Sequence, residues 1–177
     1  MKTIVGTVLF IMVLAASTAR SDVVLTDIGT NESSQPIVFA PSPKFLPPDL
    51  RHFLEGADQF TLYSLKNHFE RNGTNTFFDR PILGQIKIEK TVERTNLVTA
   101  LSDGIGTGRV PADCFDPRHG IRAVKNGVAV DFLICFECGT IDVFSSKGTN
   151  WSFEVSETPA VLFNQTLQNA GIPLSPN

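Results

Sequence analysis

The dipeptide Asn126-Gly127 constrains the fold of this chain most strongly, because it lies between two apolar-rich runs. Asn and Gly both tolerate the positive φ angles of a two-residue type I′ turn, so the pair predicts a β-hairpin. The turn sets the register, in which Arg122 faces Asp131 and Ile121 faces Phe132. Because side chains alternate along a strand, the charge pair is expected on one face of the hairpin and the apolar pair on the other.

Hydrophobic spacing and turn residues predict the other elements. Further strands are expected at residues 58–65, 82–89, 140–144 and 151–155, and a short helix at 49–56. A longer helix is expected from a Thr91 cap to Gly104, and a last helix from a Thr158 cap, with Pro159 first, to a stop before Gly171. Because these elements show no regular βαβ alternation, they predict an α+β fold, an antiparallel β-meander packed against two main helices in a single layer on the sheet.

The first 19 residues have the pattern of a signal peptide. Lys2 precedes an apolar run, and Ser17 and Ala19 are the small residues that signal peptidase needs at −3 and −1. The run is shorter than the roughly 20 residues that cross a bilayer as a helix, although an uncleaved anchor is the alternative. Residues 20–48 are expected to form an extended Pro/Ser-rich leader and residues 49–177 a single domain. We therefore expect an exported protein, in the periplasm, in the cell envelope or secreted.

The charge balance argues against two classes of partner. The chain has 15 Lys and Arg against 18 Asp and Glu, a formal net charge of −3. Nucleic acids and anionic membrane surfaces are bound by an excess of basic residues, so neither is expected as a partner. No other segment is long and apolar enough to span a membrane, so no transmembrane segment is expected in the mature chain.

All three cysteines lie within residues 114–138, and a disulfide is the first interpretation, because an exported protein meets oxidants. Three cysteines allow one bridge and leave one thiol. Strand alternation puts Cys135 and Cys138 on opposite faces, so a bridge between them needs the chain to turn. A bridge from Cys114 to either one is easier and would stabilise the fold by roughly 3 kcal/mol.

A metal site is the second interpretation of the same residues. The segment from Cys135 to Gly139, with Cys138 within it, resembles a zinc knuckle, and Cys114 and His119 would complete a tetrahedral Cys3His zinc site. An oxidising compartment opposes this interpretation, because zinc needs the thiolates in their reduced form. No cofactor is therefore expected, with zinc as the alternative.

A thiol-dependent enzyme is the third interpretation, with one of the three cysteines as nucleophile. His119 would be its base and Asp113 or Asp116 the acid that orients the base. Arg118, His119 and Arg122 are close in sequence and would favour a neighbouring thiolate. The spacing of these residues does not require such an arrangement, so no catalytic residue is assigned.

Residues around His119 also have a purely structural explanation. Asp116-Pro117 predicts the start of a type I turn, with Gly120 following, and His119 would then bond to a backbone group. Arg118 would tie this loop to a carboxylate such as Glu137, or would contact an anionic ligand. The same two interpretations apply to Arg122.

The segments Cys114-Phe115, Pro117–Gly120 and Cys135–Cys138 form the pattern CFxPRHG followed by a strand and then CFEC. This pattern resembles an uncharacterised family of exported bacterial proteins. The chain is also similar to that family around Leu62–Leu65 and Ala170–Leu174. The resemblance covers residue 49 to the C-terminus and implies export, but it brings no activity with it. We therefore expect an exported non-enzymatic binding or structural module that is stapled by one disulfide.

Overall fold

The computed structural model describes residues 44–107 and 114–176. The predicted signal peptide and most of the predicted leader lie outside these ranges. Leu46, which belongs to the predicted leader, is 4% exposed and lies in the core. The last residues before Pro48 are thus part of the folded domain, while the rest of the leader stays a prediction.

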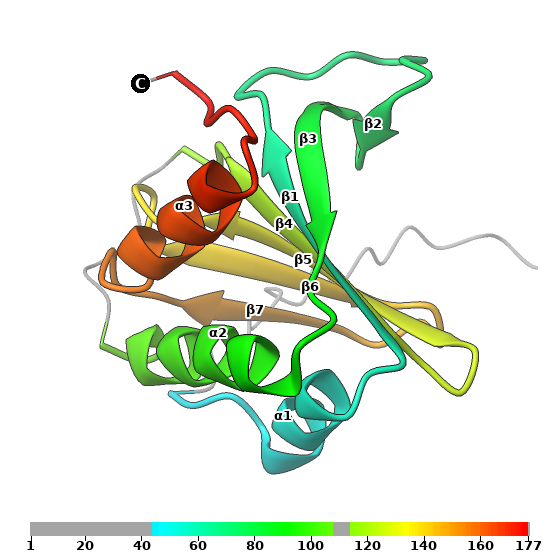
Figure 1. Cartoon of the computed structure of the whole chain (residues 1–177), viewed down its shortest axis with the longest axis vertical. Coiled ribbons are helices and arrows are strands. Elements are labelled where there is room, and N and C mark those ends of the chain that lie inside the picture. Colours follow the sequence, from blue (N-terminus) through cyan, green and yellow to red (C-terminus); the bar gives the residue numbers. More distant parts are fainter. Residues whose placement is uncertain (1–43, 108–113, 177) are drawn as a thin grey trace, which may run out of the picture. The chain divides into compact units, whose positions relative to one another are not determined.

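The described residues form three helices and one antiparallel sheet of seven strands (Figure 1). The helices are α1 (Pro48–Glu55), α2 (Thr91–Gly104) and α3 (Ala160–Asn169). The strands are β1 (Gln59–Leu65), β2 (Thr76–Phe77), β3 (Arg80–Lys87), β4 (His119–Lys125), β5 (Val128–Cys135), β6 (Thr140–Ser145) and β7 (Asn150–Glu154). This arrangement confirms the predicted α+β class.

The strand order in the sheet is β2-β3-β1-β4-β5-β6-β7. Strands β4 to β7 follow one another as a meander, as the sequence predicts. Strand β1 lies between β3 and β4 and pairs with both, an arrangement that local sequence does not specify. The short strand β2 extends the sheet beyond β3. It lies in a polar stretch for which no strand was predicted.

The hairpin of β4 and β5 has the predicted register, with Arg122 opposite Asp131 and Ile121 opposite Phe132. Asn126 and Gly127 have φ angles of 50° and 75°, which a type I′ turn requires. Nε and Nη2 of Arg122 donate to the two carboxylate oxygens of Asp131 at 2.7 and 2.8 Å. The hydrogen bonds to Asp131 raise the pKa of Arg122. The charge partner of Arg122 therefore lies opposite it on the neighbouring strand of the sheet.

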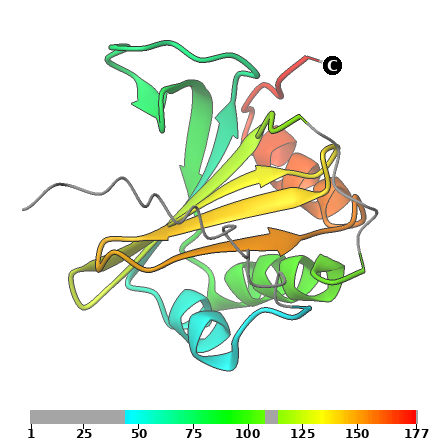
Figure 2. The same cartoon turned by 180° about the vertical axis from the view of Figure 1, so that it is seen from behind.

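The helices form one layer on one face of the sheet, in front of the strands in Figure 1 and behind them in Figure 2. The main core lies between these two layers. Its largest fully buried side chains come from every helix and from five strands: Leu54, Phe60, Leu62, Leu97, Leu101, Ile121, Phe132, Ile134, Ile141, Phe153 and Phe163. Burial of this much apolar surface is the main stabilising contribution to the domain.

A second, smaller apolar cluster lies on the opposite face of the sheet, where it holds Tyr63, Leu65, Phe77 and Leu133. It explains why β1 is buried at every position after Gln59, since Phe60 and Leu62 enter the main core and Tyr63 and Leu65 enter this cluster. Phe77 covers Gly120, where a Cβ atom would lie 2.8 Å from Cε1 of the ring. Gly120 is thus a strand residue that makes room for Phe77. The predicted turn at Asp116-Pro117 is wrong, because residues 114–118 form no turn and lead directly into β4 at His119.

The helix termini differ slightly from the prediction. The N-cap of α2 is Lys90 and that of α3 is Pro159, and neither makes a side-chain capping bond, so Thr91 and Thr158 do not act as caps. Gly171 follows α3 with a φ angle of 73°, as a glycine past a helix end should. None of the helices in the described ranges has the length and apolar character that a membrane span requires.

Candidate functional site

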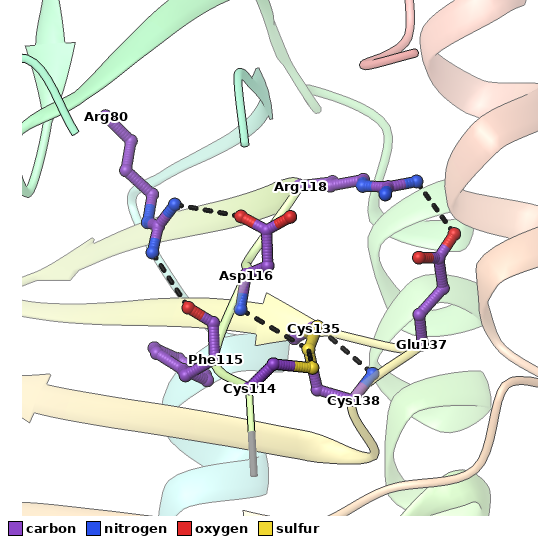
Figure 3. The surroundings of a disulfide bond; sticks show 8 residues. All are labelled: Arg80, Cys114, Phe115, Asp116, Arg118, Cys135, Glu137 and Cys138. Atoms are coloured by element: carbon purple, nitrogen blue, oxygen red, sulfur yellow. Dashed lines mark hydrogen bonds and ion pairs between the residues drawn. A yellow bond between two sulfur atoms is a disulfide. The ribbon is translucent and has the colours of Figure 1, made fainter. Parts of the chain in front are cut away.

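The three cysteines meet at one end of the sheet, where the segment entering β4 passes the turn after β5 (Figure 3). Cys135 ends β5, and the chain then turns, with the amide of Gly139 donating to the carbonyl of Phe136 at 3.3 Å. This turn brings the Cα atoms of Cys135 and Cys138 to 5.1 Å, and the two residues form a disulfide. The preference for a bridge from Cys114 was wrong, because strand alternation stops at Cys135.

Cys114 is exposed, and its thiol is free. Its Sγ lies 3.6 Å from Sγ of Cys138. Two backbone amides are directed at the sulfurs of the disulfide, that of Asp116 at Cys138 Sγ (3.3 Å) and that of Cys138 at Cys135 Sγ (3.1 Å). The structure therefore brings all three predicted cysteines into one cluster.

Arg80, at the start of β3, holds the segment that carries Cys114 (Figure 3). Its side chain is almost completely buried, and it donates from Nη1 to Oδ1 of Asp116 at 3.1 Å and from Nη2 to the carbonyl of Phe115 at 2.9 Å. Burial lowers the pKa of Arg80, and Asp116 opposes this effect. Sequence reasoning missed Arg80, since a lone arginine before Pro81 carries no local signal of burial.

Arg118 and Glu137 link the Cys114 segment to the turn after β5. Nη1 of Arg118 donates to Oε1 of Glu137 at 2.7 Å, which confirms the predicted tie to this carboxylate. Glu137 lies between the two bridged cysteines in the chain. Arg80 thus ties the Cys114 segment to β3, and Arg118 ties it to the disulfide turn.

His119 is the first residue of β4 and is buried on the helix side of the sheet. Its Nε2 lies 2.8 Å from Oδ1 of Asn164 on α3. Because an amide oxygen only accepts, Nε2 carries the proton and donates it. The rings of Phe136 and Phe163 pack edge-on at 5.2 and 5.9 Å. Burial lowers the pKa of His119 to about 4, Asn164 partly opposes this, and Arg118 adds to it, so the ring is neutral near pH 7.

A pocket of about 110 Å³ lies beside the disulfide. Its lining combines polar groups with a few apolar ones: Ser64, Asp116, Arg118, His119, Cys135, Phe136, Glu137, Ala160, Asn164, Leu174 and Ser175. Oγ of Ser64 donates to the carbonyl of Pro173 at 2.7 Å, whereas Oγ of Ser175 is buried and has no hydrogen-bond partner among the described residues. Asn164 and Ser175, like Arg80, have no sequence pattern that marks them as part of a site.

The predicted zinc site and the predicted thiol-enzyme site share Cys114, His119, Cys135 and Cys138. Zinc would require all three cysteines in their reduced form. Within residues 44–107 and 114–176, no three His, Cys, Asp or Glu side chains are grouped to hold a metal ion. Cys135 and Cys138 are oxidised, and His119 bonds Asn164. Zinc bound by Cys114, His119, Cys135 and Cys138 stays a prediction for the reduced protein. A catalytic base with a pKa of about 4 would be weak at neutral pH.

Comparisons with family models, with curated proteins and with solved structures find no match to this chain. The resemblance to exported bacterial proteins with the CFxPRHG and CFEC segments therefore stays a prediction.

Proposed function

We propose that this chain is an exported binding domain whose ligand site is the pocket beside the Cys135–Cys138 disulfide. The observation that supports this proposal is the buried Oγ of Ser175, a pocket-lining residue, because this atom has no hydrogen-bond partner among the described residues. A buried hydroxyl without a partner costs about 1–3 kcal/mol, and a bound polar group would recover part of it.

The charges around the pocket indicate a neutral ligand. Asp116 is paired with Arg80 at 3.1 Å, and Glu137 with Arg118 at 2.7 Å. His119 is neutral near pH 7 because its pKa is lowered to about 4. A charged ligand would have to compete with these ion pairs, whereas a neutral group with hydrogen-bond donors and acceptors would not.

The size of the pocket limits the ligand to a small polar group. A volume of about 110 Å³ is several times the roughly 10–15 Å³ that one water needs on the same measure. An amide or an alcohol group fits this space, either as a small molecule or as the end of a larger partner. Such a fragment has few atoms to contribute, so its Kd alone should be about millimolar.

Acetamide and acetate test the proposal, because they have nearly the same shape and differ in charge. We expect acetamide to shift the backbone amide resonances of His119, Asn164 and Ser175 in the 15N-labelled protein, and acetate to shift them less. The variant Ser175→Ala should weaken the response to acetamide at least threefold. Equal responses to both probes, or no change in the variant, would contradict the proposal.

Export is proposed on the N-terminal pattern, and the disulfide supports it, because disulfides persist in oxidising compartments. Intact mass of the protein purified from its exporting host should show a chain that begins at Arg20. A chain that keeps residues 1–19 would contradict cleavage after Ala19.

A further inference from the structure

The sulfur cluster combines an exposed thiol with a disulfide that is almost completely buried. Cys114 is exposed, whereas Cys135 and Cys138 are each 3% exposed. Sγ of Cys114 lies 3.6 Å from Sγ of Cys138, and a covalent bond between them needs a separation of about 2 Å. A modest movement of the Cys114 segment would therefore close the gap.

We propose that Cys114 exchanges with the Cys135–Cys138 disulfide, so that the domain has two intramolecular disulfide states. Cys114 first loses its proton to solvent, and its thiolate then attacks Sγ of Cys138. The Cys114–Cys138 bond forms, the Cys135–Cys138 bond breaks, and its electron pair leaves on Cys135, which takes up a proton. The step is an isomerisation without net oxidation, so it needs neither an oxidant nor a reductant.

The backbone amides favour attack at Cys138 with Cys135 as the leaving group. The amide of Cys138 lies 3.1 Å from Sγ of Cys135, the atom on which negative charge develops. Hydrogen bonds to an ionised acceptor are about twice as strong as neutral ones, so this bond strengthens as the leaving thiolate forms. The amide of Asp116 at 3.3 Å holds Sγ of Cys138, the sulfur that stays bridged in both states.

The ion pairs around the cluster keep the attacking segment in place. Arg80 binds Asp116 and the carbonyl of Phe115, the two residues that follow Cys114 (Figure 3). Arg118 binds Glu137 in the disulfide turn. Positioning of this kind raises the rate of an intramolecular reaction, because the reacting atoms are already close before the bond forms.

The exchange changes which cysteine carries the free thiol. With the Cys135–Cys138 bond, the free thiol is Cys114 on the surface. With the Cys114–Cys138 bond, the segment before β4 is stapled to the turn after β5, and the free thiol is Cys135 in the pocket wall. The domain would thus move a reactive thiol from the surface into the pocket.

Removing one sulfur at a time tests the exchange in the full chain. In Cys135→Ser, Cys114 and Cys138 remain, and we expect them to form a disulfide in air, so that alkylation in denaturant without reductant adds no label to the intact mass. The matched control Cys138→Ser lacks the sulfur shared by both states and should take two labels. Near-ultraviolet circular dichroism would establish that each variant is folded. Two labels on folded Cys135→Ser, or none on Cys138→Ser, would overturn the proposal.

The unaltered protein gives an independent measurement. Incubation with N-ethylmaleimide under native conditions, followed by non-reducing peptide mapping, should place label on Cys135 as well as on Cys114. The variant Cys114→Ser has no attacking thiol and should take no label. Label confined to Cys114 throughout the time course would overturn the proposal, whatever the variants show.

Discussion

The substitution Arg80→Met should destabilise the domain by about 2 kcal/mol. Methionine keeps most of the apolar stem but removes the bonds to Asp116 and to the carbonyl of Phe115, at 3.1 and 2.9 Å. Hydrogen bonds of a charged group contribute about 1.5–3 kcal/mol each. Water reaches the carboxylate of Asp116, which is 31% exposed, and the buried guanidinium is itself costly, so the net loss falls near the lower limit.

Urea unfolding in a Cys114→Ser background measures this loss without interference from thiol exchange. For a slope of about 2 kcal/mol/M, the midpoint of unfolding should fall by about 1 M. The matched control is Arg51→Met, since Arg51 is 39% exposed, pairs with Glu55 on α1 and donates to Oγ1 of Thr99 at 3.2 Å. Exposed pairs of this spacing contribute about 0.5 kcal/mol. A loss in Arg80→Met within 0.5 kcal/mol of the control would refute the reasoning about the buried arginine, where ~2 kcal/mol is expected.

Two further perturbations address His119 and the hairpin turn. The pKa of His119 is about 4 in the fold and about 6.5 in the unfolded chain, so its contribution is complete above pH 6.5 and is lost as the pH falls to 4. The difference in unfolding free energy between the wild type and His119→Gln should fall by about 3 kcal/mol over that range, and a constant difference would contradict the burial argument. Asn126→Val places a β-branched residue at a φ angle of 50° and should lower the Tm by about 5 °C, whereas Asn126→Gly should change it little; equal Tm values for the two variants would count against the turn.

The sequence predicted the elements whose pairing is local. Asn126-Gly127 and the alternating residues on either side set the register of β4 and β5, because a two-residue turn leaves one way to pair the strands. The meander as far as β7 followed from the same kind of signal. The position of β1 did not, since its pairing with β3 and β4 is a property of the assembled sheet.

The sequence predicted several residues of the site, but it predicted only part of their arrangement in space. The three cysteines cluster as their spacing suggested, but the pairing depended on a turn that strand alternation does not reveal. His119 was placed with the cysteines, whereas its partner, Asn164, lies on α3, far along the chain. Arg80 escaped notice because its burial is produced entirely by tertiary packing.

The position of β1 between β3 and β4 has a consequence for the order in which the sheet assembles. Strands β4 to β7 are joined by short turns, so they pair at little cost in chain entropy. In contrast, Thr61 of β1 pairs with Arg122 of β4 only after the chain that holds β3 and α2 has looped back. We expect pulse-labelled amide exchange during refolding to protect the meander before β1, and simultaneous protection would argue against this order. A strand from the interior of the finished sheet is therefore expected to be among the last to join it.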